Sequence, residues 1–464
     1  MKLCYYTIKA IQNKIKNKEV SVTEVTQSVL QRIEKADGKA KNFITVTEEE
    51  ALQEAKKIDE ELHKGNQLPP LAGIPMAVKD NICVDGVKTT CGSKILENFI
   101  APYNATVIEK LKNQKAIFLG KLNMDEFAMG SSIVEGSAVS VIDDAVFFAL
   151  GSDAGGSIRQ SAGFCGVVGL KPTYGRVSKY GLVTFAPSLD QIGPITKNVE
   201  DAAIVLEAIS GQDFFDVNSA DVAVDNYQKH LSQDIKGLKI GLPKEYFPGN
   251  LNPDIREAVL KVAAKLEYMG AIVEECSLPH TEYALASYYI IASAEASSNL
   301  ARFDGVRYGY RDMGAEDLLN MYKKTRQEGF GSEVKKRIML GTYALSSGHY
   351  DDYFLRAQKI RTLVKNDFDK AFGKYDCLLT PVSSIYPINT FNQGEKEDNS
   401  LSMYLADLFT VPVNMAGLPA ICFPYGFSED DSSIGLQLIG KAFDEKTILR
   451  IAYAYENDIS WLER

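Results

Sequence analysis

Ser157 and Lys79 are the residues of this sequence whose types and surroundings could do chemistry. Ser157 follows two glycines in the stretch Gly151–Gln160, and such glycines let consecutive backbone N–H groups converge on one point, as in an oxyanion hole. Lys79 ends the apolar stretch Leu71–Val78 and does not lie on a charged helix face. A serine hydroxyl becomes nucleophilic when a nearby base takes its proton, and a lysine whose pKa is lowered by burial can be that base. The pattern favours a nucleophilic serine with a lysine base; a serine in a tight turn or at a helix N-cap is the structural alternative.

Motifs for other chemistries do not occur in the sequence. There is no G-x-S-x-G elbow, and the four histidines suit surface or turn positions better than a catalytic triad. There is no P-loop and no G-x-G-x-x-G motif, so we do not expect ATP to bind through a phosphate loop. No C-x-x-C or H-x-x-x-H pair occurs, so we expect no metal site. The seven cysteines are odd in number and scattered, which indicates free thiols in a reducing compartment.

The elements that must position these residues alternate between strands and helices. Ser21 with Glu24, and Thr47 with Glu50, match capping boxes and predict two helices, the first ending near Gly38. Further helices are predicted by amphipathic periodicity at Thr106–Lys112, Asn198–Ile209 and Asp254–Met269, with long helical stretches from Ser287 to Phe372. Strands are predicted by short apolar runs at Leu71–Val78, Ala116–Leu119, Leu238–Leu242, Ile272–Cys276, Cys377–Leu379 and Ala420–Tyr425. This alternation predicts an α/β sheet with helical cover.

The glycine-rich segment Gly151–Pro194 is not a flexible linker. Apolar residues such as Ile158, Val168 and Leu170 are interleaved with its glycines, and linkers lack such residues. We therefore expect this segment to pack inside the protein, where its glycines allow tight turns and close backbone approach to a ligand.

Composition and charge limit the class of protein. The chain has 464 residues, 45% of them hydrophobic and 24% charged, which is typical of a globular protein. Its net charge of −10 argues against a protein that binds nucleic acid by itself, because phosphate contacts need clustered Lys and Arg. Met1–Lys18 lacks the apolar core of a signal peptide, and no apolar run is long enough to span a membrane, so we expect a cytoplasmic protein.

The motifs around Ser157 and Lys79 resemble those of the amidase signature family, serine hydrolases with a Ser–Ser–Lys triad. Within that family the sequence is similar to the glutamine-hydrolysing subunits of tRNA-dependent amidotransferases. The resemblance covers nearly the whole chain and is carried by Leu71–Cys83, Gly151–Gln160, Cys165–Gly181, Ser188–Pro194, Ile291–Tyr310, Phe330–Ser347 and Val411–Pro419. It implies a single α/β amidase-signature fold over residues 1–464, with a central mixed β-sheet covered by helices on both faces. Within it we expect a helical N-terminal part (1–66), a catalytic core (67–211) and a second lobe with the C-terminal part (212–464).

The resemblance also implies roles for individual residues. Lys79 would be the base and Ser157 the acyl-forming nucleophile. Arg337 and Asp407 would bind the α-carboxylate and α-amino groups of glutamine, which suits a guanidinium and a carboxylate, and Tyr288 would line the same pocket.

Further positions follow from the same motifs. The backbone N–H groups of Ala154, Gly155, Gly156 and Ser157 would form the oxyanion hole. Arg159 and Asp190 match structural positions of the family.

The reaction implied by the resemblance has two halves. This chain would hydrolyse glutamine to glutamate and ammonia. A partner B subunit would use the ammonia, with ATP and Mg²⁺, to convert Glu-tRNA(Gln) into Gln-tRNA(Gln), in a complex that also holds a C subunit. The chain itself would bind no cofactor and no membrane, and the tRNA would be held mainly by the B subunit, in keeping with the acidic charge.

One segment departs from the family pattern. The family carries the relay serine of the triad about two dozen residues before the nucleophile, but here the residue 24 positions before Ser157 is Ile133. Roughly twenty residues of the family pattern are missing between Ser132 and Ile133. Either Ser131 or Ser132 takes the vacated place, or the chain is an impaired scaffold subunit.

Two further expectations concern the substrate and a pair of carboxylates. A free-standing amidase acting on another small amide is the alternative within the family, although Arg337 and Asp407 favour an amino-acid substrate. Asp143 and Asp144 stand where the family has small apolar residues, and we expect them to be exposed or rearranged, because buried unpaired carboxylates are costly.

Overall fold

A large mixed β-sheet is the centre of the fold. The computed structural model describes residues 2–130, 136–384, 406–427 and 432–458. In this described part, eleven strands form one sheet. Their order in space is β1 (Phe43–Val46), β3 (Ile117–Leu122), β2 (Pro75–Lys79), β4 (Phe148–Asp153), β6 (Gln191–Thr196), β5 (Val168–Lys171), β10 (Ala420–Phe427), β11 (Ser433–Gly440), β9 (Cys377–Pro381), β7 (Lys239–Pro243) and β8 (Ile272–Cys276).

The strand directions decide where the candidate catalytic residues meet. Strand β2 is parallel to both of its neighbours, β3 and β4, whereas β4 is antiparallel to β6. Parallel neighbours end at the same edge of a sheet, so the carboxyl ends of β2 and β4 lie together. Strand β2 ends at Lys79, and β4 ends at Asp153, a short turn before Ser157.

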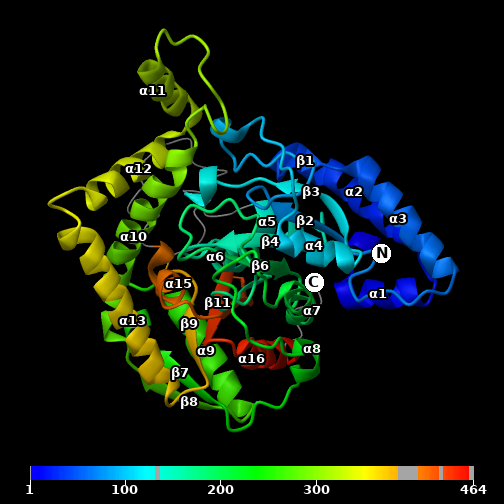
Figure 1. The fold of residues 1–464 in the computed structure, drawn as a ribbon. Helices are drawn as coiled ribbons and strands as arrows, with labels where there is room; N and C mark the ends of the chain where they lie inside the picture. Colours follow the sequence, from blue (N-terminus) through cyan, green and yellow to red (C-terminus); the bar gives the residue numbers. More distant parts are fainter. Residues whose placement is uncertain (1, 131–135, 385–405, 428–431, 459–464) are drawn as a thin grey trace.

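Helices cover the sheet. Helices α5 and α6 pack against each other over β4, and α16 packs on α7, β10 and β11. Figure 1 shows α10, α12 and α13 grouped on one side of the molecule, opposite α2 and α3. The helices are α1 (Ile8–Lys16), α2 (Val22–Ala40), α3 (Glu48–His63), α4 (Thr106–Asn113), α5 (Gly136–Ile142), α6 (Ser157–Cys165), α7 (Val199–Ile209), α8 (Tyr227–His230), α9 (Pro253–Tyr268), α10 (Ala284–Asn299), α11 (Leu318–Gly329), α12 (Ser332–Leu345), α13 (Arg356–Phe372), α15 (Val411–Ala416) and α16 (Glu445–Asn457). The predicted α/β fold, with a central mixed sheet covered by helices on both faces, is confirmed.

Local capping signals were partly right. The first capping box is confirmed: Glu24 N–H donates to Ser21 Oγ at 3.1 Å, and Ser21 N–H donates to Glu24 Oε2 at 2.8 Å. The second box is wrong although its helix exists. The Thr47 hydroxyl donates to the carbonyl of Phe118 on β3 instead of capping α3.

The glycine-rich segment packs inside the protein, as predicted, and its Gly163 lies at a contact between a helix and the sheet. Ile158, Val168 and Leu170 are buried. Helix α6 lies so close to β11 that a Cβ on Gly435 would stand 2.4 Å from the Cα of Gly163. Gly163 of this segment and Gly435 of β11 therefore bring the backbones of helix and strand into contact.

Asp143 and Asp144 follow the end of α5 and are half-buried, so the expected exposure is only partial. Asp144 forms an ion pair with Lys197. The seven cysteines all lie in the described residues, and all are free thiols. Within the described ranges, no helix combines the length and the apolar character that a membrane crossing would need.

A buried ion pair fixes α6 to the end of β4. Both side chains of the Asp153–Arg159 pair are fully buried, and Arg159 Nε and Nη2 each donate to the Asp153 carboxylate at 3.1 Å. Burial alone would raise the pKa of Asp153, but the Arg159 guanidinium and the Asn414 amide hold that pKa below its ordinary value. Arg159 Nη1 also donates to the Thr410 carbonyl and to Gln437 Oε1, both at 3.1 Å. One guanidinium thus links β4, α6, the segment before α15 and β11.

We predict that Arg159→Met strongly destabilises the protein. The substitution leaves the Asp153 carboxylate buried without its cation, a change that typically costs about 3–5 kcal/mol of unfolding free energy. Urea denaturation monitored by circular dichroism measures the loss. Lys261→Met is the control, because Lys261 forms an exposed ion pair with Glu257 and its loss should leave the midpoint unchanged. Equal midpoints for the two variants would contradict the role given to Arg159.

A second buried carboxylate makes stability depend on pH. Asp201 on α7 accepts hydrogen bonds from the N–H groups of Ile8 and Lys9 at the start of α1, at 2.8 and 3.3 Å. Burial raises the pKa of Asp201 to about 7, against the effect of these two hydrogen bonds. The folded-state pKa is thus higher than that of the unfolded chain, so the protonated group stabilises the fold at low pH. This contribution is lost as the pH rises toward and through 7.

We predict that Asp201→Asn flattens this pH dependence. In the unmodified protein, this group alone lowers the free energy of unfolding by up to about 1.4 kcal/mol per pH unit between its two pKa values. Urea titrations at about pH 5 and about pH 8 compare the two proteins. Asp369→Asn, at an exposed position of α13, should keep the dependence of the unmodified protein. The same slope in Asp201→Asn would rule out this source.

Candidate functional site

The turn between β4 and α6 carries the predicted nucleophile and oxyanion hole. Ser157 is the first residue of α6 and is half-buried, and Ala154, Gly155 and Gly156 form the turn before it. The N–H groups at a helix start have no partner within the helix, so this turn presents donors together with the positive end of the helix dipole. Gly156 has φ +153°, and a Cβ there would stand 2.5 Å from Thr410 Oγ1, so both conformation and space require glycine. The arrangement can stabilise an oxyanion beside a serine hydroxyl.

Lys79 lies fully buried at the end of β2, next to the strand that leads to Ser157. Its Nζ donates to the carbonyl of Ser152 on β4 at 3.3 Å. The Ser152 hydroxyl in turn accepts a hydrogen bond from the Asn81 amide at 2.9 Å. The predicted base therefore ends one strand, and the predicted nucleophile follows the parallel strand beside it, an arrangement that the sequence did not predict.

A second buried lysine, Lys121, lies on β3, the other parallel neighbour of β2. Lys121 on β3 forms an ion pair with Asp80 at 3.2 Å, and both side chains are fully buried. Burial lowers the pKa of Lys121, and Asp80 opposes that effect. The Asp80 carboxylate also accepts hydrogen bonds from the N–H and hydroxyl of Thr90. The carboxylate next to Lys79 in sequence is thus occupied by other groups and fixes the backbone that follows β2.

The predicted substrate-binding residues come together around one tyrosine, Tyr289, which none of the sequence motifs marks. Tyr289 follows Tyr288 on α10, and its hydroxyl donates to Asp407 Oδ2 at 2.6 Å. The guanidinium of Arg337, on α12, lies over the Tyr289 ring, 5.2 Å from its centroid. Arg337 Nε also donates to Glu333 Oε1 at 2.8 Å, one helical turn earlier. Arg337 and Asp407, 70 positions apart in the chain, therefore flank the same aromatic ring.

This cluster adjoins the turn before Ser157. A Cβ on Gly155 would stand 2.6 Å from the Tyr288 hydroxyl, so Tyr288 lies directly against the turn. Gln160, one helical turn after Ser157, donates from Nε2 to Asp407 Oδ1 at 2.9 Å. Gln160 was not predicted as a site residue. Its position in the sequence, one helical turn after the candidate nucleophile and on the same helix face, could have indicated it.

The charges of the cluster suit an amino acid. Burial raises the pKa of Asp407, whereas the hydrogen bonds from Tyr289 and Gln160 and the nearby Arg337 lower it. Burial and the neighbouring Asp407 raise the pKa of both Tyr288 and Tyr289, so the two phenols stay protonated. For Arg337, burial works against the charged form, but the two tyrosines and Glu333 raise its pKa. A fixed cation and a buried carboxylate on one ring match the carboxylate and ammonium of an α-amino acid.

Two predicted catalytic residues, Ser131 and Ser132, lie outside the described residues. Among the residues that are described, no group of three or more His, Cys, Asp or Glu side chains could hold a metal ion.

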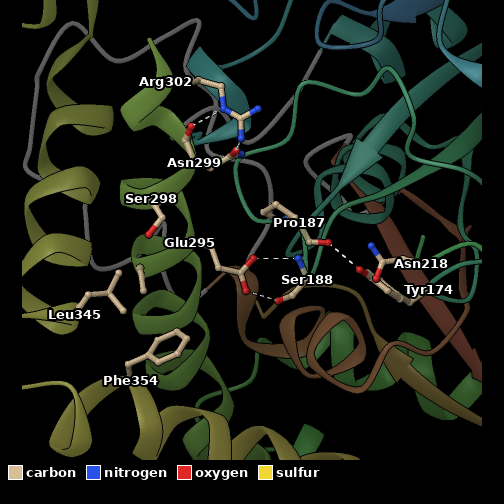
Figure 2. Close-up of a pocket in the computed structure, with 11 residues that line it drawn as sticks. Tyr174, Pro187, Ser188, Asn218, Glu295, Ser298, Asn299, Arg302, Leu345 and Phe354 are labelled. Atoms are coloured by element: carbon tan, nitrogen blue, oxygen red, sulfur yellow. Dashed lines mark hydrogen bonds between the residues drawn. The ribbon is translucent and has the colours of Figure 1, made fainter. Parts of the chain in front are cut away.

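A separate cavity of about 550 Å³ is lined in part by the second half of α10, which follows Tyr288 and Tyr289 (Figure 2). Figure 2 shows Glu295 directed toward Ser188, whose N–H donates to Glu295 Oε2 at 2.9 Å. Tyr174, Asn218 and Phe354 are among its other lining residues. Within the described part of the chain, none of the predicted site residues lines this cavity.

Comparison with known proteins identifies the family. The amidase family model matches residues 24–135 and 134–449. The chain is 53% identical to the A subunit of the glutamyl-tRNA(Gln) amidotransferase of Moorella thermoacetica, over 100% of this chain and 99% of that protein. It is 54% identical to the protein of the same name from Carboxydothermus hydrogenoformans, over 99% and 98% of the two chains.

A solved structure agrees with these relatives. The A subunit of the glutamyl-tRNA(Gln) amidotransferase of Thermotoga maritima superposes with a TM-score of 0.80 at 38% identity, covering 99% of this chain and 96% of that one. The resemblance seen in the sequence motifs is thereby confirmed, and the chain belongs to the amidase signature family.

Proposed function

We propose that this chain is the glutamine-hydrolysing subunit of a tRNA-dependent amidotransferase. The observation that carries the proposal is the pairing of Arg337 and Asp407 around Tyr289, next to the turn that holds Ser157. The full-length relatives, which are named as A subunits of glutamyl-tRNA(Gln) amidotransferases, support the same assignment. The ammonia released would serve the conversion of Glu-tRNA(Gln) to Gln-tRNA(Gln).

The proposed reaction begins with binding of glutamine by its α-amino acid end. Arg337 holds the carboxylate and Asp407 the ammonium, so the side-chain amide extends toward the β4–α6 turn. Ser157 Oγ attacks the amide carbon while its proton passes to Lys79, directly or through a relay hydroxyl. The oxyanion accepts hydrogen bonds from N–H groups of the turn.

Two proton transfers complete the cycle. Lys79 returns the proton to the amide nitrogen, the C–N bond breaks, and ammonia leaves a glutamyl ester on Ser157. Water then attacks the ester carbonyl, its proton returns to Ser157 Oγ through the same base, and glutamate is released. The turn and Lys79 serve both halves, since each half passes through a tetrahedral oxyanion.

The proposed division of labour assigns the tRNA and ATP to other chains. A B subunit would hold Glu-tRNA(Gln), ATP and Mg²⁺, and a C subunit would complete the complex. A net charge of −10 suits a subunit that supplies ammonia and leaves tRNA phosphates to its partner. Because aminoacyl-tRNA is used by ribosomes, we place this reaction in the cytoplasm.

The second candidate is a scaffold subunit without glutaminase activity. It is favoured by Ile133, which stands at the spacing of the family's relay serine. The family model matches in two pieces that meet at residues 134–135, and the alignment with the Moorella protein spans 485 positions although this chain has 464 residues. The break in the family match supports a shortened segment at this point, and the longer alignment is in keeping with positions absent from this chain.

We predict that Ser157→Ala, in the complex with the B and C subunits, loses ammonia release from glutamine by at least about 1,000-fold. A coupled glutamate dehydrogenase assay measures the ammonia. Ser346→Ala, on the turn after α12, is the matched control and should keep full activity. Both variants should still form Gln-tRNA(Gln) when ammonium chloride replaces glutamine. An unmodified complex no better than Ser157→Ala would refute the glutaminase and leave the scaffold.

We predict that either Ser131→Ala or Ser132→Ala reduces glutaminase activity by orders of magnitude, because removal of one member of a triad disables the unit. The other single variant should retain most activity and serves as the control. Single-turnover measurements of ammonia release compare them with the unmodified complex. Full activity in the double variant would show that neither hydroxyl is the relay.

A further inference from the structure

Helix α6 carries two functional groups of the candidate site one turn apart. Ser157 is its first residue, and Gln160 lies three positions later, on the same face of the helix. The Gln160 Nε2 group lies within hydrogen-bond distance of three acceptors: the Ala406 carbonyl at 2.8 Å, Asp407 Oδ1 at 2.9 Å and Thr410 Oγ1 at 3.0 Å. One side-chain amide thus connects the nucleophile's helix to the segment that carries Asp407.

The Asp407 carboxylate is held from two sides. Gln160 donates to its Oδ1, and the Tyr289 hydroxyl donates to its Oδ2 at 2.6 Å. An ionised carboxylate has about four lone-pair positions, so it can still accept further hydrogen bonds from an ammonium group. Both neighbours stabilise the charged form, which an ammonium ligand requires.

The Gln160 side chain packs against the turn that precedes Ser157. A Cβ built on Gly156 would stand 2.9 Å from the Gln160 side-chain carbon Cδ, so the amide packs directly against that glycine. Asp407 itself begins a three-residue 3-10 turn, η8 (Asp407–Phe409), and not a long helix that would fix its direction. The direction of its carboxylate therefore depends on side-chain contacts.

We propose that Gln160 is a positioning residue that sets substrate specificity: it orients Asp407 toward the substrate's α-ammonium group at a fixed place relative to Ser157. Amides of α-amino acids are then selected over amides that lack the amino group. This inference rests on the proposed glutaminase function. It extends that function by assigning the selection of the ammonium group to a residue on the nucleophile's own helix.

A purely structural role for Gln160 makes a different prediction. Its bonds to the Ala406 carbonyl and Thr410 hydroxyl also hold the local backbone, and their loss would lower the rate with every substrate. An analogue of glutamine without the amino group, 4-carbamoylbutanoate, separates the two roles, because it has the same amide and carboxylate but no ammonium for Asp407.

The test compares kcat/KM for glutamine and for 4-carbamoylbutanoate in the assembled complex. In Gln160→Met, which keeps the chain length and removes the donor, we expect glutamine to lose about tenfold or more, mainly through KM. The analogue should change less than about twofold. Asp407→Asn should show the same selective loss, and Gln31→Met, the same substitution at an exposed position of α2, should show none.

Other outcomes overturn the inference. Equal losses for both substrates in Gln160→Met would leave Gln160 a structural role only, and unchanged kinetics with glutamine would remove any role. If Gln160→Met does not assemble, Gln160→Glu keeps the shape, replaces the donor with a second carboxylate facing Asp407, and should give the same selective loss. An unmodified complex that hydrolyses neither substrate would refute the proposed function itself, and with it this inference.

Discussion

The buried pair of Asp153 and Arg159 holds the parts of this molecule in register. Asp153 ends β4 and Arg159 lies on the first turns of α6, so the pair closes the turn on which Ser157 stands. The same guanidinium reaches the Thr410 carbonyl and Gln437 on β11, and Asn414 completes the network. Moving a buried charge away from its partners is costly, because water cannot replace the hydrogen bonds that the charged group loses. The network therefore joins β4, α6, α15 and β11 at the middle of the sheet.

The residues of the candidate site come from segments around this network that are far apart in the sequence. Lys79 ends β2, and Ser157 and the turn before it follow the parallel strand β4. Tyr288, on α10, packs against Gly155 of that turn. Arg337 and Asp407 come from α12 and from the segment before α15, and both contact Tyr289. Each charged residue has a second group that fixes its direction, Glu333 for Arg337 and Gln160 for Asp407. The charges of the cluster are thereby held in place by their neighbours, and preorganised charges and dipoles lose little energy to rearrangement during a reaction.

Glycine has two different uses in the same stretch of chain. Gly156 adopts a left-handed conformation beside Thr410, where no side chain fits, and shapes the turn before Ser157. Gly163 meets Gly435 backbone to backbone and brings α6 onto the sheet. The first use shapes a turn and the second is packing, yet in the sequence Gly156 and Gly163 are simply two glycines in one glycine-rich segment. On the same closely packed helix, Arg159 lies within hydrogen-bond distance of Gln437 on β11.

The sequence by itself determined the fold class, the family, and the residues that bear recognisable motifs. Apolar runs and capping residues act locally, so the helix after Ser21 and strand β8 could be predicted from their own residues. Strands β4 and β11 were not predicted: β4 lies where glycine and aromatic residues break a simple period, and β11 is fully buried and has no alternation. Only the tertiary structure decided that Gln160 and Tyr289 both hold Asp407, because hydrogen bonds across 247 and 118 positions leave no local pattern. Motifs record the type and spacing of residues along the chain, whereas the direction of a buried carboxylate is fixed by neighbours that come together only when the sheet and its helices have packed.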